Sequence, residues 1–148
     1  MASDNAPWTL TIPSDLRLIV LARHFVESFC HHAGFDRQST EAVVLATHEA
    51  INNVIRHAHE GQCHAKLEIQ CQLVPDGLEI CVFDEGKPFD VSTVPHLNPG
   101  ELRIGGRGVF LMRTLMDELS CQPREDCGNM LRMVKRCRRN SSTHFECQ

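Results

Sequence analysis

The chain has 148 residues, of which 42% are hydrophobic and 23% charged, values that suit one globular domain with a sizeable core. Its net charge of −4 excludes a general electrostatic attraction to nucleic acid or to an anionic membrane surface. The N-terminus lacks the pattern of a signal peptide, and no apolar run approaches the ~20 residues that span a bilayer.

The first half of the chain predicts one strand and two helices. Residues 8–12 alternate apolar and polar side chains, which indicates a short strand. Helical spacing of apolar residues follows over 14–32, with Ser14 as the expected cap and Gly34 as the residue that ends the helix. A second helix is expected over 36–58, because that stretch contains no internal Gly or Pro.

The second half predicts two strands, over 64–74 and 78–83, followed by a long loop over 86–105. A helix is then expected over 108–119, and a closing hairpin with arms at 119–122 and 130–134. This order predicts an α/β fold, a two-layer sandwich whose mixed, mostly antiparallel sheet carries the helices on one face. Residues 1–137 are expected to form one domain, and residues 138–148 a C-terminal tail. A loop of about 20 residues inside a compact domain is uncommon and is usually functional or disordered.

The eight cysteines include no C-x-x-C pair, and several lie within apolar strand-like runs. With no signal peptide in the sequence, this spacing favours reduced thiols that pack as small hydrophobic side chains. We therefore expect a cytoplasmic protein rather than a secreted disulfide scaffold.

The second predicted helix carries a polar row beside its apolar face. Glu49, Asn53 and His57 follow at a spacing of i, i+4, i+8, a position that suits side chains lining a cleft. An Asn supplies a hard oxygen ligand for Mg²⁺, and a Glu one turn away can accept a proton from an attacking hydroxyl group. An ordinary polar helix flank is the competing interpretation of the same row.

Two further segments carry candidate site residues. Asp84 directly follows an apolar strand, where its carboxylate can accept a hydrogen bond from an exocyclic amine, and Gly86 allows the backbone to approach a flat ring. The same D-x-G pattern is also common in turns. Gly106 and Gly108 lie in a glycine-rich stretch that opens a helix, a typical anion site.

Taken in order, E-A-I-N-N-V-I-R-H at 49–57, D-E-G-K-P-F-D at 84–90 and G-G-R-G-V-F-L-M-R-T-L-M-D-E-L at 105–119 resemble the three ATP motifs of the GHKL superfamily. The third segment is most similar to bacterial anti-sigma-factor serine/threonine kinases of the partner-switching type. The resemblance extends over about 8–136 and implies a Bergerat-type ATP-binding fold that uses ATP and Mg²⁺.

By position, the resemblance implies that Asn53 is the Mg²⁺ ligand and Glu49 the general base. It likewise implies that Asp84 accepts the adenine amine above Gly86, while Gly106 and Gly108 bind phosphate. The sequence departs from the family pattern twice. Pro88 stands where many members have a third glycine, which bears on how the lid hinges, and Asn129 replaces the usual Thr near adenine.

The resemblance implies a serine/threonine protein kinase that phosphorylates an anti-anti-sigma (STAS-type) partner and sequesters a sigma factor. The alternative is a catalytically silent, ATP-gated binding module in the same kind of pathway. The presence of both Glu49 and Asn53 favours the kinase. A homodimer is also expected, both from the resemblance and because the strand at 8–12 is predicted to be a sheet edge open to pairing.

Overall fold

A computed structural model describes residues 6–58, 65–86, 107–125 and 127–137. In chain order the elements are β1 (Trp8–Pro13), the 3-10 turn η1 (Leu16–Leu18), α1 (Ile19–Ala33), α2 (Arg37–Asn53), the π turn η2 (Val54–Ala58), β2 (Lys66–Val74), β3 (Gly77–Phe83), α3 (Arg107–Leu115), β4 (Glu118–Pro123) and β5 (Asn129–Arg136). The predicted tail and nearly all of the predicted long loop lie outside the described residues. Within the described ranges, no helix is long and apolar enough to cross a membrane.

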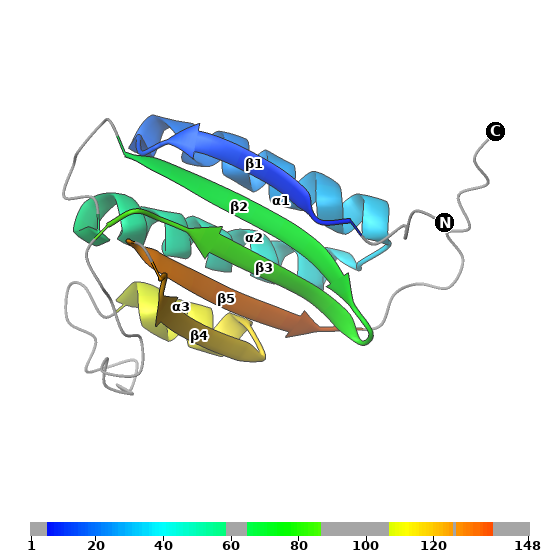
Figure 1. The fold of residues 1–148 in the computed structure, drawn as a ribbon. Coiled ribbons are helices and arrows are strands. Elements are labelled where there is room, and N and C mark those ends of the chain that lie inside the picture. The colour runs from blue at the N-terminus through cyan, green and yellow to red at the C-terminus, as the bar shows by residue number, and fades with distance from the viewer. Residues whose placement is uncertain (1–5, 59–64, 87–106, 126, 138–148) are drawn as a thin grey trace.

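The strands form one sheet in the order β1-β2-β3-β5-β4, and each pair of neighbours is antiparallel. Figure 1 shows the three α-helices on one face of this sheet, so that the molecule has two layers. This arrangement confirms the predicted two-layer α/β sandwich. Because β5 lies between β3 and β4, the last strand of the chain is interior and β4 forms an edge.

The core lies between the sheet and the helices. The neighbouring interior strands β2 and β3 contribute buried residues at alternate positions, namely Leu67, Ile69, Cys71, Leu78, Ile80 and Val82. The strand register places Ile69 opposite Val82 and Cys71 opposite Ile80, so these side chains share the face that the helices cover. The helices contribute buried residues that include Ala22, Val26, Val43, Ala50 and Ile51.

The first helix begins later than predicted, and Ser14 is not its cap. The backbone N–H of Ser14 donates to the carbonyl of Ala65, just before β2 begins, so this residue still belongs to the strand connection. Asp15 caps the 3-10 turn η1 that precedes α1: its carboxylate accepts a hydrogen bond from the backbone N–H of Arg17. The N-cap of α1 itself is Leu18, which makes no side-chain capping bond. The predicted end of the helix is confirmed, because Gly34 follows α1 in the left-handed conformation, with φ at 82°.

The second and third helices end earlier than predicted. α2 begins after its N-cap Asp36, as expected, but α-helical bonding stops at Asn53 and the π turn η2 follows. A π turn has more residues than an α turn, so α-helical spacing does not extend beyond Asn53. α3 ends at Leu115, and Leu119 instead pairs with Met133 in the sheet. Helical spacing alone extended this helix too far, because pairing with β5 also packs the partly buried side chain of Leu119 against the core.

The cysteines in the described residues are free, and Cys30, Cys71 and Cys81 are buried. This result agrees with the prediction that the thiols pack as small hydrophobic side chains. Cys127 differs from these three because it is exposed, in the turn between β4 and β5.

Candidate functional site

Two polar side chains of α2 adjoin the start of α3. Glu49 and Asn53 lie one helical turn apart and both are partly exposed. Gly108, in the first turn of α3, is buried against them. A Cβ atom added at Gly108 would lie 3.1 Å from Oε2 of Glu49 and 3.2 Å from both Nδ2 and Oδ1 of Asn53. The structure therefore brings together three residues that the sequence places in two distant motifs.

The close approach at Gly108 depends on its lack of a side chain. Distances of 3.1 and 3.2 Å are tighter than ordinary contacts of a Cβ atom, so any larger residue would displace Glu49 or Asn53. The N-terminal end of a helix carries unpaired N–H groups and partial positive charge. The arrangement thus combines a proton acceptor, a hard oxygen ligand and an anion-binding helix end.

Asp84 forms a second cluster, at the end of β3. Its side chain is buried, with a relative exposure of 3%, and its carboxylate oxygen Oδ1 accepts two hydrogen bonds. The backbone N–H of Gly86 donates one of them over 2.8 Å, and Nδ2 of Asn129 donates the other over 3.1 Å. From the sequence, Asn129 was only a departure from the family pattern. In the structure its side chain donates a hydrogen bond directly to the carboxylate of Asp84.

The turn between β4 and β5 holds the main chain of Asp84. The N–H of Asp84 donates to the carbonyl of Asn129 over 3.0 Å, and the N–H of Asn129 donates to the carbonyl of Asp84 over 3.3 Å. Nη1 of Arg124 donates to the same carbonyl over 3.1 Å, and its guanidinium group lies 5.5 Å from the centre of the Phe83 ring. Sequence reasoning missed Arg124, since no local pattern links it to a residue 40 positions earlier.

Both clusters lie at the same end of the molecule. In Figure 1 the end of α2, the end of β3, the beginning of β5 and the beginning of α3 are gathered at one side. The residues predicted for the site therefore share one end of the fold, with Glu49, Asn53 and Gly108 in one cluster and Asp84 and Gly86 in the other. The remaining predicted residue, Gly106, lies outside the described residues.

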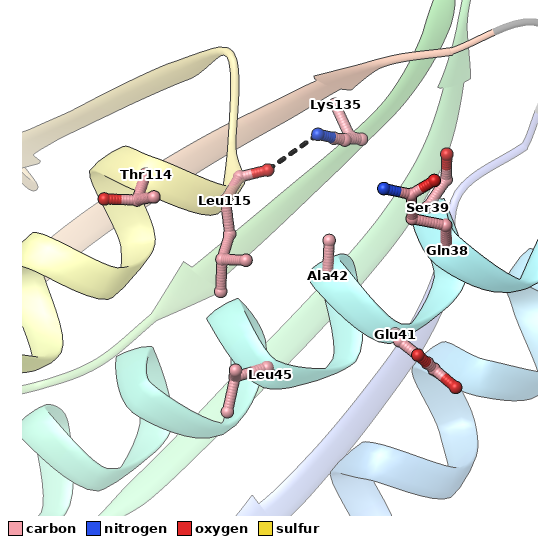
Figure 2. Close-up of a pocket in the computed structure, with 8 residues that line it drawn as sticks. All are labelled: Gln38, Ser39, Glu41, Ala42, Leu45, Thr114, Leu115 and Lys135. Atoms are coloured by element: carbon pink, nitrogen blue, oxygen red, sulfur yellow. Dashed lines mark hydrogen bonds between the residues drawn. The ribbon is translucent and has the colours of Figure 1, made fainter.

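A cavity of about 470 Å³ lies elsewhere, along the first half of α2 (Figure 2). Its lining comes from α2, the end of α3 and β5, and consists of Gln38, Ser39, Glu41, Ala42, Leu45, Thr114, Leu115 and Lys135. Nζ of Lys135 donates to the carbonyl of Leu115 at its edge, over 2.8 Å. None of the predicted site residues lines this cavity, so it is separate from the two clusters.

Comparison with known families identifies the chain. The sequence model of the histidine kinase-like ATPase domain matches residues 12–135. The chain belongs to this family. The matched range of this family member includes both side-chain clusters and every residue predicted for the site. The resemblance inferred from the three motifs is thereby confirmed.

Named relatives and a solved structure agree with this family assignment. The serine-protein kinase RsbW of Listeria innocua is 32% identical over 127 residues, which cover 80% of this chain and 81% of the relative. RsbW of Halalkalibacterium halodurans is 30% identical over 134 residues, which cover 85% and 80% of the two chains.

The crystal structure of the SiaB-SiaC complex from Pseudomonas aeruginosa contains a similar fold, with a TM-score of 0.67 over 86% of this chain and 88% of that one. At 16% identity, this last likeness concerns the fold alone.

Proposed function

We propose that this member of the histidine kinase-like ATPase family is an ATP- and Mg²⁺-dependent serine/threonine protein kinase that acts as an anti-sigma regulatory factor. It phosphorylates an anti-anti-sigma protein of the STAS type and sequesters a sigma factor. The observation that carries the proposal is the contact of Glu49 and Asn53 with Gly108 at the start of α3. The names of the RsbW relatives, serine-protein kinases, support the class of reaction.

Asp84 and Gly86 serve the adenine end of the nucleotide in this proposal. The carboxylate of Asp84 accepts a hydrogen bond from the exocyclic amine, and Gly86 leaves space for the ring. The fit rests on the chemistry of the cluster, because a buried carboxylate that receives two donors on one oxygen retains acceptor capacity on the other.

Asn53, Gly106 and Gly108 serve the phosphate end. The side-chain oxygen of Asn53 would be the protein ligand that holds Mg²⁺, an ion that usually takes few protein ligands. When bound, Mg²⁺ neutralises negative charge on the phosphates. Gly108 has no side chain to obstruct the approach of phosphate oxygens to the N-terminal end of α3. The space that a Cβ atom at Gly108 would fill is consistent with this use.

Glu49 is the proposed general base. It lies one turn before Asn53 on α2, and its Oε2 adjoins the same glycine, so it can face the transferred phosphoryl group without holding the metal. Its carboxylate accepts the proton of the partner's serine or threonine hydroxyl as that oxygen bonds to phosphorus and ADP leaves.

The experiment compares the wild type with Glu49→Gln and Asn53→Ala for ATP affinity and for phosphate transfer to a candidate STAS-type protein. Glu49→Gln keeps the shape of the side chain and loses the proton acceptor, so ATP binding should persist while transfer falls by about 10²–10⁴-fold. Asn53→Ala should lose Mg²⁺-dependent nucleotide binding and transfer together.

A Glu49→Gln protein that transfers phosphate at the wild-type rate would show that this carboxylate is not the base. A wild-type protein that binds a STAS-type partner tightly with ATP but transfers no phosphate would instead support the ATP-gated binding module. Failure of the wild type to bind ATP at all would refute both versions.

A further inference from the structure

The turn between β4 and β5, taken together with Asn129 at the start of β5, contacts Asp84 at its side chain and its main chain. Nδ2 of Asn129 reaches the carboxylate, while Nη1 of Arg124 and the N–H of Asn129 reach the carbonyl oxygen. Gly128 lies directly over the same carbonyl, with φ at 91°, and a Cβ atom there would come within 1.9 Å of that oxygen. The turn therefore meets Asp84 at a distance that only glycine permits.

The side-chain bonds fix the orientation of the carboxylate. Two groups donate to the same oxygen, Oδ1. One is the backbone N–H of Gly86, two residues after Asp84, and the other is Nδ2 of Asn129 in β5. Both partners donate, since a carboxylate meets the nitrogen of an amide rather than its oxygen, so Asp84 acts as an acceptor. Asn129 is itself 1% exposed, so its side chain has little room to turn away from Asp84.

A fixed acceptor discriminates between purines. An amino group at position 6 of the ring offers a donor to the second oxygen, Oδ2, whereas an oxo group at that position presents another acceptor. A site built to bond one polar group rejects an analogue that lacks it more strongly than an apolar pocket does. This discrimination depends on the carboxylate keeping its orientation, and so on the donor that holds Oδ1.

We propose that the β4–β5 turn is a positioning device for Asp84, and that Asn129 determines the selectivity of the site for a 6-aminopurine nucleotide over a 6-oxopurine nucleotide. Arg124 supports it by holding the carbonyl of the same residue. The inference rests on the proposed nucleotide site and adds to it a residue that neither touches phosphate nor takes part in transfer.

The test measures the dissociation constants of ATP and inosine triphosphate for wild type, Asn129→Leu and Asn129→Thr by calorimetry. Leucine matches asparagine in size and has no donor, so the preference for ATP should fall by about tenfold or more, mainly because ATP binds less tightly. Threonine retains a hydroxyl donor and should give an intermediate preference. Urea unfolding of each variant measures whether folding is lost. If Asn129 has a purely structural role, its replacement should lower the affinities for both nucleotides equally and leave the preference for ATP unchanged.

Equal preference for ATP in the wild type and in both variants would overturn the inference while leaving ATP binding and the proposed kinase intact. A wild type that binds the two nucleotides equally would overturn it as well. If Asn129→Leu does not fold, the affinities for ATP and inosine triphosphate are compared in Asn129→Thr and in Arg124→Ala instead. Arg124 is exposed, so its replacement is compatible with folding. A wild type that binds neither nucleotide would refute the proposed function itself.

Discussion

The buried thiols of the core have unusual titration behaviour. Cys30 and Cys71 are fully enclosed between the helices and the sheet. Burial raises the pKa of Cys30 to about 12, and burial likewise raises the pKa of Cys81 to about 12. The pKa of Cys71 is also raised by its burial. These groups stay protonated in the folded chain at a pH at which an exposed thiol has already ionised.

This difference predicts a loss of stability at alkaline pH. In the unfolded chain the thiols titrate near their reference value of 9.0, whereas Cys30 keeps its proton in the folded chain up to about 12. The folded state then binds more protons, so the free energy of unfolding is undiminished below pH 9 and falls as pH rises above it. Each such thiol contributes a fall of up to about 1.4 kcal/mol per pH unit.

Urea unfolding at pH 8, 9 and 10 measures this fall. The chain contains no tyrosine, so phenol groups add nothing in that range. Cys30→Ala is the matched control, because it removes one thiol and should reduce the slope while lowering stability at every pH. Identical slopes in wild type and Cys30→Ala would contradict the prediction.

At the scale of elements, two glycines allow different pairs of segments to meet. Gly108 brings the start of α3 against the side chains of α2, and Gly128 brings the β4–β5 turn against the backbone at the end of β3. The first contact involves the ends of side chains, which can move. The second involves a carbonyl oxygen in the main chain, which cannot move without disturbing the sheet.

The two alanine substitutions should therefore separate stability from activity. Gly108→Ala should fold with nearly wild-type stability, because alanine favours a helix over glycine by roughly 0.5–1 kcal/mol, yet displace Glu49 and Asn53 and reduce phosphate transfer. Gly128→Ala should lose about 1–3 kcal/mol from its backbone conformation alone, with further loss from the clash.

Urea unfolding and a transfer assay on both variants provide the measurement. A Gly108→Ala protein that is active at the wild-type rate would show that the contact with Glu49 and Asn53 has no part in the reaction. A Gly128→Ala protein as stable as wild type would show that the turn can move away from β3.

At the scale of the whole molecule, the first strand and the first helix are candidates for association. β1 is an edge of the sheet, and its Trp8 packs against Phe25 and Phe29 of α1. Val20 and Leu21, at the beginning of α1, are 50% and 49% exposed. Among the described strands β1 pairs on one side only, and both an edge strand and exposed apolar side chains are common sites of association.

Homodimerisation thus remains a prediction with a defined test. The sedimentation coefficient of the wild type should rise with concentration up to tens of micromolar. Val20→Asp should lower the association, whereas Leu45→Asp, a matched change at an exposed leucine of α2, should leave it unchanged. A wild type that sediments as a monomer at every concentration would refute the prediction.

Much of the fold was predictable because its signals are local. Alternation of apolar residues identified β2 and β3, and Gly34 identified the end of α1, where its left-handed conformation is observed. The two errors in the predicted helix ends concern features that the local pattern does not carry. Helical spacing extended α3 to Leu119, although Leu119 pairs with Met133 in the sheet, a partner that lies outside any local window. No sequence pattern signalled the π turn after Asn53.

The sequence by itself determined the family and the order of the main helices and strands, because periodicity, turn chemistry and short motifs are properties of neighbouring positions. It also selected Glu49, Asn53 and Asp84 as candidates for the site. Only the tertiary structure decided that β5 enters the sheet beside β3, and this pairing places Asn129 against Asp84, 45 residues earlier. It also decided that Gly108 meets Glu49 and Asn53. Such contacts follow from strand register and helix packing, which bring together residues that no local pattern connects.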